Sequence, residues 1–315
     1  MIVLGIDGGS SHSRALLEDA TGGRLGQREA GPANRHTAGQ AQAEAALRDL
    51  VVGLLHDHRG EEVAIGAGIS GVDRPQDRRW VSRVLGEAVK AAGCHVAQIE
   101  VTNDALTVLF AQTQGNAGIC LIAGTGSIAY GVNQMGQTAR CGGWGPRLGN
   151  EGSAFWIAHQ AALHVVWAAD GRGPQTRLSE AFCAFLGISE VDGIIPAVYQ
   201  PSFGPQALAS FAPMVFAADR DGDAVATELV DRAAEVLAQQ VCAVGRRLQL
   251  ASSLSRIPLV LSGALLQAQW QRLQSSFLQA CQKEALPLAP ALLVREPAEG
   301  ALWLARRTGW LQHEQ

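Results

Sequence analysis

Residues 119–132, ICLIAGTGSIAYGV, combine an apolar run, a short glycine turn and a second apolar segment. The segment after the turn alternates as a half-buried strand does, so the stretch predicts a β-hairpin. Gly124 and Gly126 lack the side chains that would keep a ligand off the main chain, and they leave backbone N–H groups beside the hydroxyls of Thr125 and Ser127. Such a turn suits a phosphate, although an ordinary hairpin turn explains this stretch alone equally well.

The chain opens with the same pattern. Residues 2–17, IVLGIDGGSSHSRALL, predict an apolar strand, a turn at residues 8–11 and a return strand. The two copies are separated by the length of a domain, which indicates a duplicated domain rather than a short repeat. Two facing glycine turns can hold the phosphate tail of a nucleotide from both sides, and Asp7 adds a carboxylate that can position Mg²⁺ through water.

Composition indicates an ordinary globular protein. The chain has 315 residues, of which 47% are hydrophobic and 17% charged, and its formal net charge is −4. The basic residues are scattered, which argues against nucleic acid and membranes as partners. The start of the chain does not look like a signal peptide and no apolar run reaches the length of a membrane span, so the expected location is cytoplasmic. Six dispersed cysteines without a C-x-x-C pair are interpreted as reduced core residues.

The first half of the chain predicts the element order βββαβαβα. After the opening hairpin, apolar periodicity predicts a strand at 24–30, a helix at 38–56, a strand at 63–69, a helix around 81–88 and a strand at 99–102. Asn103 and Asp104 then begin a short helix.

The second half repeats this order. Strands are predicted near 118–123, 127–132, 137–141, 257–261 and 292–295, and helices at 151–167, 223–253, 267–283 and 298–308. Residues 172–222 are an additional helical insert. Strands interleaved with helices imply largely parallel sheets with ligands at the strand ends, so both glycine turns and Asp104 are expected between two α/β domains. The expected domains are 1–113, joined by a C-terminal helix at 298–311, and 114–297.

The order of motifs resembles the actin, hexokinase and Hsp70 superfamily of sugar kinases and ATPases. The motifs are LGIDGGSS at 4–11, VTNDAL at 101–106, IAGTGS at 122–127, VLSGALL at 260–266 and PAEGALWLA at 297–305. Residues 141–153, CGGWGPRLGNEGS, closely resemble the N-acetylglucosamine kinases and the related BadF/BadG/BcrA/BcrD ATPase family. The resemblance covers essentially the whole chain and implies two ribonuclease-H-like, actin-like ATPase domains with a cleft between them.

The resemblance also implies an activity and a site. The expected reaction is ATP-dependent phosphorylation of N-acetylglucosamine or glucosamine at the 6-hydroxyl. Asp104 is expected to be the general base, and Asp7 is expected to hold Mg²⁺ through water. Whether the protein forms a homodimer is left open. ATP is expected at Asp7, Gly8, Gly9, Ser10, Ser11, Gly124, Thr125, Gly126, Gly263 and Ala264. The sugar is expected at Asn34, Ser70, Gly71, Ser127, Gly143, Trp144, Gly145 and Asn150.

The sequence departs from the family pattern in three places. The first phosphate turn is usually D-G-G-G-T, whereas here Ser10 and Ser11 follow the second glycine. Asn150 replaces the usual aspartate. After the insert the family has a glycine that contacts the nucleotide, and this chain has Ala217 and Ala218 in that region. The contacts on the adenine side are therefore not assigned.

Other interpretations fit parts of the same sequence. Asp104 can be an ordinary helix-start carboxylate, and Trp144 an ordinary core residue. A BadF-type ATPase activator of a dehydratase would need paired cysteines for an iron–sulfur cluster, which the dispersed cysteines disfavour. A non-catalytic sugar- or ATP-binding regulator would carry a helix-turn-helix, for which the strand at the start of the chain leaves no room.

Overall fold

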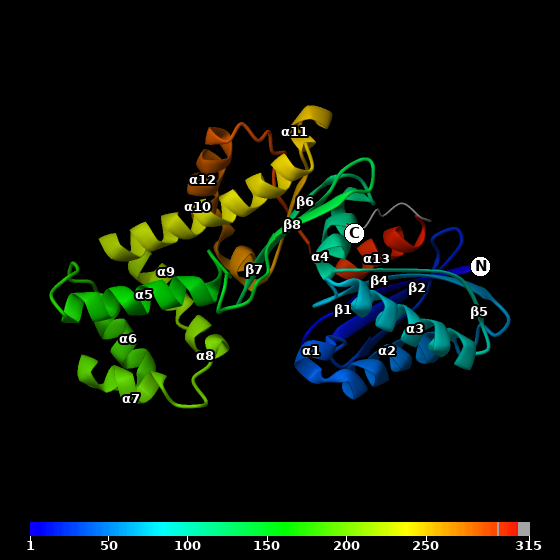
Figure 1. Ribbon diagram of the computed structural model, residues 1–315, viewed down its shortest axis with the longest axis horizontal. Coiled ribbons are helices and arrows are strands. Elements are labelled where there is room, and N and C mark those ends of the chain that lie inside the picture. The colour runs from blue at the N-terminus through cyan, green and yellow to red at the C-terminus, as the bar shows by residue number, and fades with distance from the viewer. Residues whose placement is uncertain (295, 308–315) are drawn as a thin grey trace.

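The computed structural model describes residues 1–294 and 296–307, which form two lobes (Figure 1). Each lobe contains a five-stranded mixed sheet covered by helices, and the predicted α/β fold of two actin-like domains is confirmed. The expected boundaries of the domains remain predictions.

The first sheet has the strand order β3-β2-β1-β4-β5. Its strands are β1 (Ile2–Gly8), β2 (Ser13–Asp19), β3 (Arg24–Ala30), β4 (Glu62–Ile69) and β5 (His95–Thr102). The first three are antiparallel, whereas β4 and β5 run parallel to β1, so the carboxyl ends of β1, β4 and β5 lie at one edge. The helices of this lobe are α1 (Arg35–Ala38), α2 (Gln40–Leu55) and α3 (Pro75–Ala91).

The second sheet repeats this arrangement with the order β10-β9-β6-β7-β8. Its strands are β6 (Gly118–Ala123), β7 (Ser127–Val132), β8 (Thr138–Gly142), β9 (Leu259–Ser262) and β10 (Leu292–Leu293). The hairpins are antiparallel, and β9 is parallel to β6. The strand predicted at 292–295 is therefore shorter, and residue 295 lies outside the described residues.

Helices cover the second sheet and form the insert. The covering helices are α5 (Ala154–Ala169), α10 (Ala224–Arg247), α11 (Leu250–Ser253) and α12 (Ala264–Lys283). Between α5 and α10 lie α6 (Leu178–Leu186), a 3₁₀ turn (Val191–Gly193), α7 (Ile194–Val198), α8 (Pro205–Ala209) and α9 (Ala212–Arg220). No single described helix could span a membrane by length and hydropathy, and only the bent pair of α6 with residues 191–198 meets that test.

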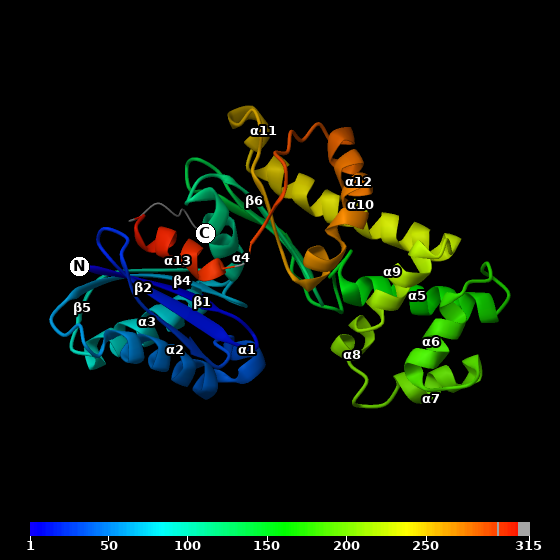
Figure 2. The ribbon, with the colours of Figure 1, turned by 180° about the vertical axis from the view of Figure 1, so that it is seen from behind.

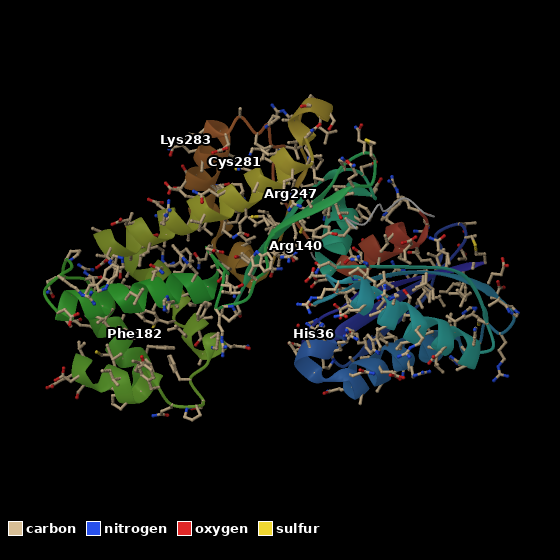
Figure 3. The ribbon with its side chains drawn as sticks, in the orientation of Figure 1. His36, Arg140, Phe182, Arg247, Cys281 and Lys283 are labelled. Atoms are coloured by element: carbon tan, nitrogen blue, oxygen red, sulfur yellow. The ribbon has the colours of Figure 1, made fainter. Side chains whose placement is uncertain are left out.

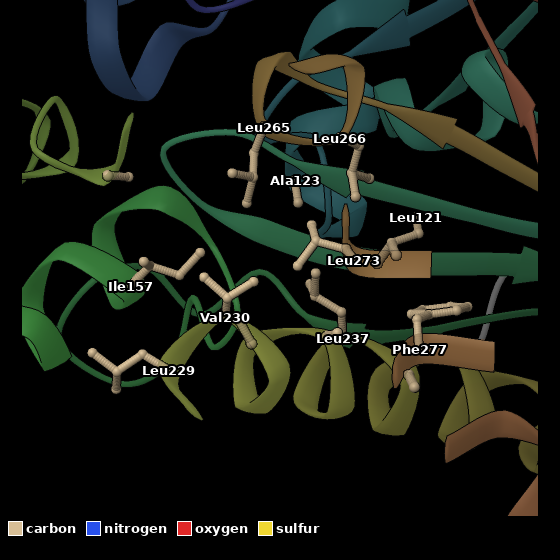
Figure 4. Packing of buried hydrophobic residues seen from close by; sticks show 14 of the residues in the cluster. Leu121, Ala123, Ile157, Leu229, Val230, Leu237, Leu265, Leu266, Leu273 and Phe277 are labelled. Atoms are coloured by element: carbon tan, nitrogen blue, oxygen red, sulfur yellow. The ribbon is translucent and has the colours of Figure 1, made fainter. Parts of the chain in front are cut away.

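The core of the second lobe lies between its sheet and the helices α5, α10 and α12. Figure 4 shows Leu121 and Ala123 of β6 facing Leu237 of α10 and Leu273 of α12, and all four are buried. Burying a side chain of leucine size stabilises a fold by about 1.5–3 kcal/mol. This packing supports the strand end from which the second glycine turn projects.

Two helices lie between the sheets, α4 (Asp104–Thr113) and α13 (Pro297–Ala305), and both remain visible there from behind (Figure 2). The helix α13 sits directly on the first sheet, because a Cβ on Gly5 would lie only 2.7 Å from the carbonyl oxygen of Ala298. The apolar side of α4 packs against Cys120 and Tyr130 of the second sheet. The two lobes therefore share the helix that begins at Asp104.

Three helix predictions need correction. The helix predicted from residue 151 begins at Ala154, because Asn150 (φ 68°) and Gly152 (φ 77°) are left-handed and the Ser153 hydroxyl caps the first turn. The helix predicted over 223–253 is broken at Gln249, which is left-handed (φ 52°). The helix predicted over 298–308 ends at Ala305, and residues 308–311 of the expected C-terminal helix lie outside the described residues.

Candidate active site

The first glycine turn connects β1 to β2. The Gly9 N–H donates to the carbonyl of His12 at 3.0 Å and closes the turn. Ser10 and Ser11 are exposed at its tip, so their hydroxyls are accessible to a ligand. A Cβ on Gly9 would lie 2.7 Å from the His12 carbonyl oxygen, and the turn therefore needs glycine there.

Two loops are attached to this turn by backbone hydrogen bonds. The Ala33 N–H donates to the carbonyl of Gly9 at 3.1 Å, and the Ser70 N–H donates to the carbonyl of Gly8 at 2.8 Å. The structure thereby brings the predicted sugar-side residues Asn34 and Ser70 to the first phosphate turn.

Asn34 and Gly71 lie against each other on these loops. Asn34 caps α1, with its Oδ1 accepting from the His36 N–H at 2.9 Å. Gly71 is left-handed (φ 78°), and a Cβ there would lie 2.9 Å from the same Oδ1. Asn34 is buried, and its capping bond sets the orientation of its side chain before any ligand arrives.

Asp104 is the first residue of α4 and follows the cap Asn103, whose side chain donates to the Asp73 carboxylate at 3.0 Å. Burial and the neighbouring charge of Asp73 raise the pKa of Asp104 to about 6, against a hydrogen bond from the Ser70 hydroxyl that lowers it. A carboxyl group with a pKa close to neutrality is well suited to accept a proton and release it again.

Asp7 occupies the end of β1 beside this carboxyl. Burial and the charges of Asp104 and Glu296 raise the pKa of Asp7 to about 7. Carboxylate oxygens are ligands that Mg²⁺ prefers, either directly or through water. Within residues 1–294 and 296–307 no three His, Cys, Asp or Glu side chains come together to hold a metal ion. The Asp7 carboxylate at the end of β1 fits a cation bound through water, and that role stays a prediction.

This electrostatic crowding predicts that Asp7→Asn stabilises the protein at neutral pH. Folding raises the pKa of Asp7 from 3.8 to about 7, so its cost to stability is absent below about pH 4 and complete above about pH 7. Asparagine carries no charge to desolvate, and we expect a gain of about 2 kcal/mol at pH 7.5. Urea unfolding without nucleotide or Mg²⁺ at pH 7.5 and pH 4 measures it. An equal gain at both pH values would rule out this origin.

The second glycine turn borders a pocket of about 440 Å³. The Gly124 N–H donates to the carbonyl of Gly126 at 2.9 Å, and the Gly124 carbonyl accepts from the Ala154 N–H at 2.9 Å. Gly124 and Thr125 form one edge of the pocket, and α5, the insert and α12 form the rest through Ala154, Gln206, Ala209, Ser210, Ala212, Pro213, Phe216, Ala264, Leu265, Ala268 and Gln269.

Of the predicted Gly263-Ala264 segment, Ala264 lines this pocket. Gly263 is left-handed (φ 98°) and precedes α12, and a Cβ there would lie 2.7 Å from the carbonyl carbon of Ala123. A Cβ on Gly124 would meet only the Ala264 backbone nitrogen, at 3.7 Å. Gly124, Thr125 and Ala264 thus line one pocket, and their contact with ATP stays a prediction.

The insert supplies the pocket wall that the sequence did not identify. The Ala217-Ala218 region does not line the pocket. The pocket is lined instead by Ala212, Pro213 and Phe216 of α9, together with Gln206 and Ala209 of α8. A proline in the first turn of a helix next to an insert seam was the available signal, but only the packing of α9 against α5 and α10 shows which face is presented.

Of the remaining sugar-side residues, Ser127 begins β7, and the others lie on the loop after β8. Trp144 stands between the left-handed Gly143 and Gly145, is 62% exposed, and has the Arg140 guanidinium 4.4 Å from its ring centre. Figure 3 marks Arg140 on the second lobe and His36, beside Asn34, on the first. An aromatic face held in solvent by a neighbouring cation can pack on the apolar face of a sugar.

Asn150, on this loop, and Ser127, at the start of β7, are both buried. A Cβ on Gly126 would lie 3.0 Å from Asn150 Oδ1, so the asparagine packs on the second turn. The Ser127 hydroxyl donates to the Glu151 carbonyl at 2.7 Å and accepts from the Gln240 amide at 3.3 Å. These bonds attach the loop to β7, and a sugar contact by Ser127 stays a prediction.

The chain is similar in sequence to one ATPase family and to two kinases of N-acetylglucosamine. The model of the BadF/BadG/BcrA/BcrD ATPase family matches residues 4–305. N-acetyl-D-glucosamine kinase of Dictyostelium discoideum is 31% identical over 278 residues, which cover 83% of this chain and 84% of that protein. N-acetylmuramic acid/N-acetylglucosamine kinase of Clostridium acetobutylicum is 31% identical over 245 residues, which cover 77% of this chain and 78% of that protein.

A solved structure is similar over almost the full length. It comes from Chromobacterium violaceum and is provisionally named as an N-acetylglucosamine kinase. The TM-score is 0.67 at 25% sequence identity, and the match covers 96% of this chain and 98% of that one.

Proposed function

Because the chain belongs to the BadF/BadG/BcrA/BcrD ATPase family and is a sugar kinase that uses ATP, we propose that it phosphorylates N-acetylglucosamine or glucosamine at the 6-hydroxyl. One observation carries the proposal. The Asp104 carboxyl lies close to the first phosphate turn. Its charge raises the pKa of Asp7 at the end of β1, and the Ser70 hydroxyl, whose backbone N–H donates to the Gly8 carbonyl at 2.8 Å, lowers the pKa of Asp104. A proton acceptor and a phosphate turn therefore share one site.

ATP is proposed to bind with its nucleoside in the pocket of α8, α9 and α12. Its phosphates would pass over Gly124 and Thr125, whose backbone lines that pocket, toward the hydroxyls of Ser10 and Ser11. Backbone N–H groups and hydroxyls stabilise phosphate oxygens without a charged side chain. Asp7 would hold Mg²⁺ through water, and the bound ion would neutralise charge on the phosphate oxygens.

Asp104 is proposed to take the proton of the sugar hydroxyl as it attacks the γ-phosphate. Asp104 is half-buried as the first residue of α4, where the sugar hydroxyl would approach it. With a pKa of about 6 it is mostly ionised at pH 7.5, as a base must be, and proton transfer by a placed carboxylate contributes about 10²–10⁴-fold.

Asn34 and Gly71 from the first lobe, with Trp144 and Asn150 from the second, are proposed to surround the sugar. The loops that carry them, beside α1 and after β8, belong to different lobes (Figure 1). A coupled assay of ADP release across glucose, glucosamine, N-acetylglucosamine and N-acetylmuramic acid tests the substrate class. The proposal would be refuted if neither glucosamine nor N-acetylglucosamine supported ADP release.

The cysteines argue against the alternative of a dehydratase activator. A cluster shared at a dimer interface needs accessible thiols, whereas five of the six cysteines, Cys94, Cys120, Cys183, Cys242 and Cys281, are buried. Only Cys141 is partly exposed.

Asn150→Asp tests the departure from the family's aspartate. An aspartate would accept sugar hydroxyls with a full charge, and charge-assisted hydrogen bonds are stronger by about 1 kcal/mol. The left-handed backbone at Asn150 (φ 68°) also tolerates aspartate. We expect a KM for the sugar that is unchanged or several-fold lower, with ATP affinity retained. Loss of activity, or a change of preference from the acetylated to the free amino sugar, would instead make this position a selector of the substrate.

A further inference from the structure

Gln240 is a polar residue on the buried, otherwise apolar side of α10, and only 5% of it is exposed. Its Nε2 donates to the Glu151 carbonyl at 3.0 Å and to the Ser127 hydroxyl oxygen at 3.3 Å. A carbonyl oxygen can only accept, so the amide nitrogen faces Glu151, and both hydrogens of the amide are used. The orientation of this side chain is therefore fixed by acceptors on two separate segments of the chain.

The loop at residues 143–153, after β8, is attached to the second hairpin at both ends. At its start, the Gly143 N–H donates to the Ser127 carbonyl at 2.9 Å. Near its end, the Ser127 hydroxyl donates to the Glu151 carbonyl at 2.7 Å. Because Gln240 donates to both partners of this second attachment, it connects the loop to α10 as well as to β7.

The end of β8 also fits around the Gln240 side chain. Gly142 is left-handed (φ 80°), and a Cβ there would lie 2.6 Å from Gln240 Oε1. That oxygen accepts no hydrogen bond from any described residue, so the bonds of this side chain come from its donor half. An apolar side chain would fill the same space in α10 without the cost of burying an amide.

Asn150 is the residue that these attachments hold in place. Its backbone is left-handed (φ 68°), which is uncommon outside glycine and persists where the surroundings fix it. Its carbonyl accepts from the Ser153 N–H at 3.1 Å, and the residue that follows it is the one bound by Gln240. The Asn150 side chain then packs on the second glycine turn, where a Cβ on Gly126 would lie 3.0 Å from Asn150 Oδ1.

We propose that Gln240 is a positioning residue for the sugar. It holds the loop at residues 143–153 so that Trp144 and Asn150 are oriented before the sugar binds. The proposal rests on the proposed function, in which both residues surround the sugar. It assigns an effect on sugar affinity to a side chain of α10 that is buried beneath the loop and does not contact the ligand.

The test is Gln240→Met, which keeps the length of the side chain and removes both donors. A loop that is correctly oriented for only part of the time binds with an affinity reduced by that fraction. We expect KM for the preferred amino sugar to rise by about 3- to 10-fold, since a hydrogen bond contributes a net factor of that order. The value of kcat should stay close to that of the wild type, because the lost interaction orients the bound sugar in ground state and transition state alike. An unchanged KM would overturn the proposal.

ATP affinity should be normal in Gln240→Met. Among the described residues, none that lines the pocket beside the second glycine turn belongs to α10. Calorimetric titration with ATP measures this. Equal losses of ATP and sugar affinity would mean that the substitution disturbs the whole lobe, and would overturn the positioning role.

Val241→Ala is the matched control. Val241 is the next residue of α10, is fully buried and packs in the apolar core of the second lobe. Its truncation also removes buried contacts from α10, so thermal unfolding of both variants shows the loss of stability in each. KM for the sugar should be unchanged in Val241→Ala. A rise as large as that in Gln240→Met would show that any weakening of α10 raises KM, and would overturn the assignment to Gln240.

A readout without catalysis separates this proposal from the proposed function. Hydrogen–deuterium exchange of the full-length protein without ligands should be several-fold faster across residues 143–153 in Gln240→Met, and unchanged across the first hairpin at residues 2–19. Unchanged exchange across 143–153 overturns the positioning role even if the wild-type protein phosphorylates an amino sugar. Absence of ADP release by the wild type with either amino sugar instead refutes the proposed function, and the exchange still decides whether Gln240 holds the loop.

Discussion

Asp104→Asn is expected to lower kcat by about 10²-fold or more while sugar binding stays nearly intact, because general-base catalysis contributes that much. Asparagine has the same shape and can occupy the first position of α4 after the cap Asn103, but its amide cannot take up the hydroxyl proton. Turnover is measured by coupled ADP release, and sugar affinity by calorimetric titration of the same preparation.

Asp73→Asn is the matched control for this substitution. Asp73 is an exposed carboxylate that accepts from the Asn103 side chain and acts on Asp104 only through its charge. Its removal should change kcat only a few-fold. It should also move the acid limb of the pH profile of kcat/KM to lower pH, because one charge that opposes the ionisation of Asp104 is lost. Near-normal turnover in Asp104→Asn would falsify the base assignment.

Gly124→Val should weaken ATP binding by about 10- to 100-fold without weakening sugar binding. A phosphate displaced from backbone donors loses charge-assisted hydrogen bonds of about 1.5–3 kcal/mol. Gly124 is the better test of the turn, because a Cβ there would meet only the Ala264 nitrogen at 3.7 Å and would project into the pocket. A Cβ on Gly126 would lie 3.0 Å from Asn150 Oδ1, so its replacement would also disturb the loop.

Gly86→Val provides the comparison for Gly124→Val. A Cβ on Gly86 would likewise make one ordinary contact, at 3.6 Å to Ile99 on the first sheet, and Gly86 lies in α3 away from the pocket. Titration with ATP should show normal affinity in this variant. If Gly124→Val also bound ATP normally, the second glycine turn would be a hairpin turn and no more.

Much of the fold could be predicted because its signals are local. Each hairpin combines apolar strands with a glycine turn, and Asp104 follows a strand and a capping asparagine, so neighbouring residues fix these features. Because the domain is duplicated, the second sheet has the same strand arrangement as the first. In each sheet, three antiparallel strands are followed by strands that run parallel to the first of them.

The features that the sequence did not show depend on contacts between distant residues. The Ser127 hydroxyl is occupied by Gln240, more than a hundred positions away, and the pocket wall depends on which face α9 turns toward α12. The helix breaks between α10 and α11 because the backbone of Gln249 is left-handed. Glutamine rarely adopts that conformation, so the sequence did not predict the break. Ser10 could be recognised as a departure from the family pattern, but its partners Asn34 and Ser70 lie on separate loops.

The position of the transferred phosphate tests the central proposal most directly. Full-length protein is incubated with ATP, Mg²⁺ and N-acetylglucosamine or glucosamine, and the product is examined by ¹H–³¹P correlation NMR. We expect one new phosphate monoester coupled to the two protons of C6, formed in step with ADP and absent without the protein. A phosphate coupled to the proton of C1, or ADP formed without any sugar phosphate, would contradict phosphorylation at the 6-hydroxyl.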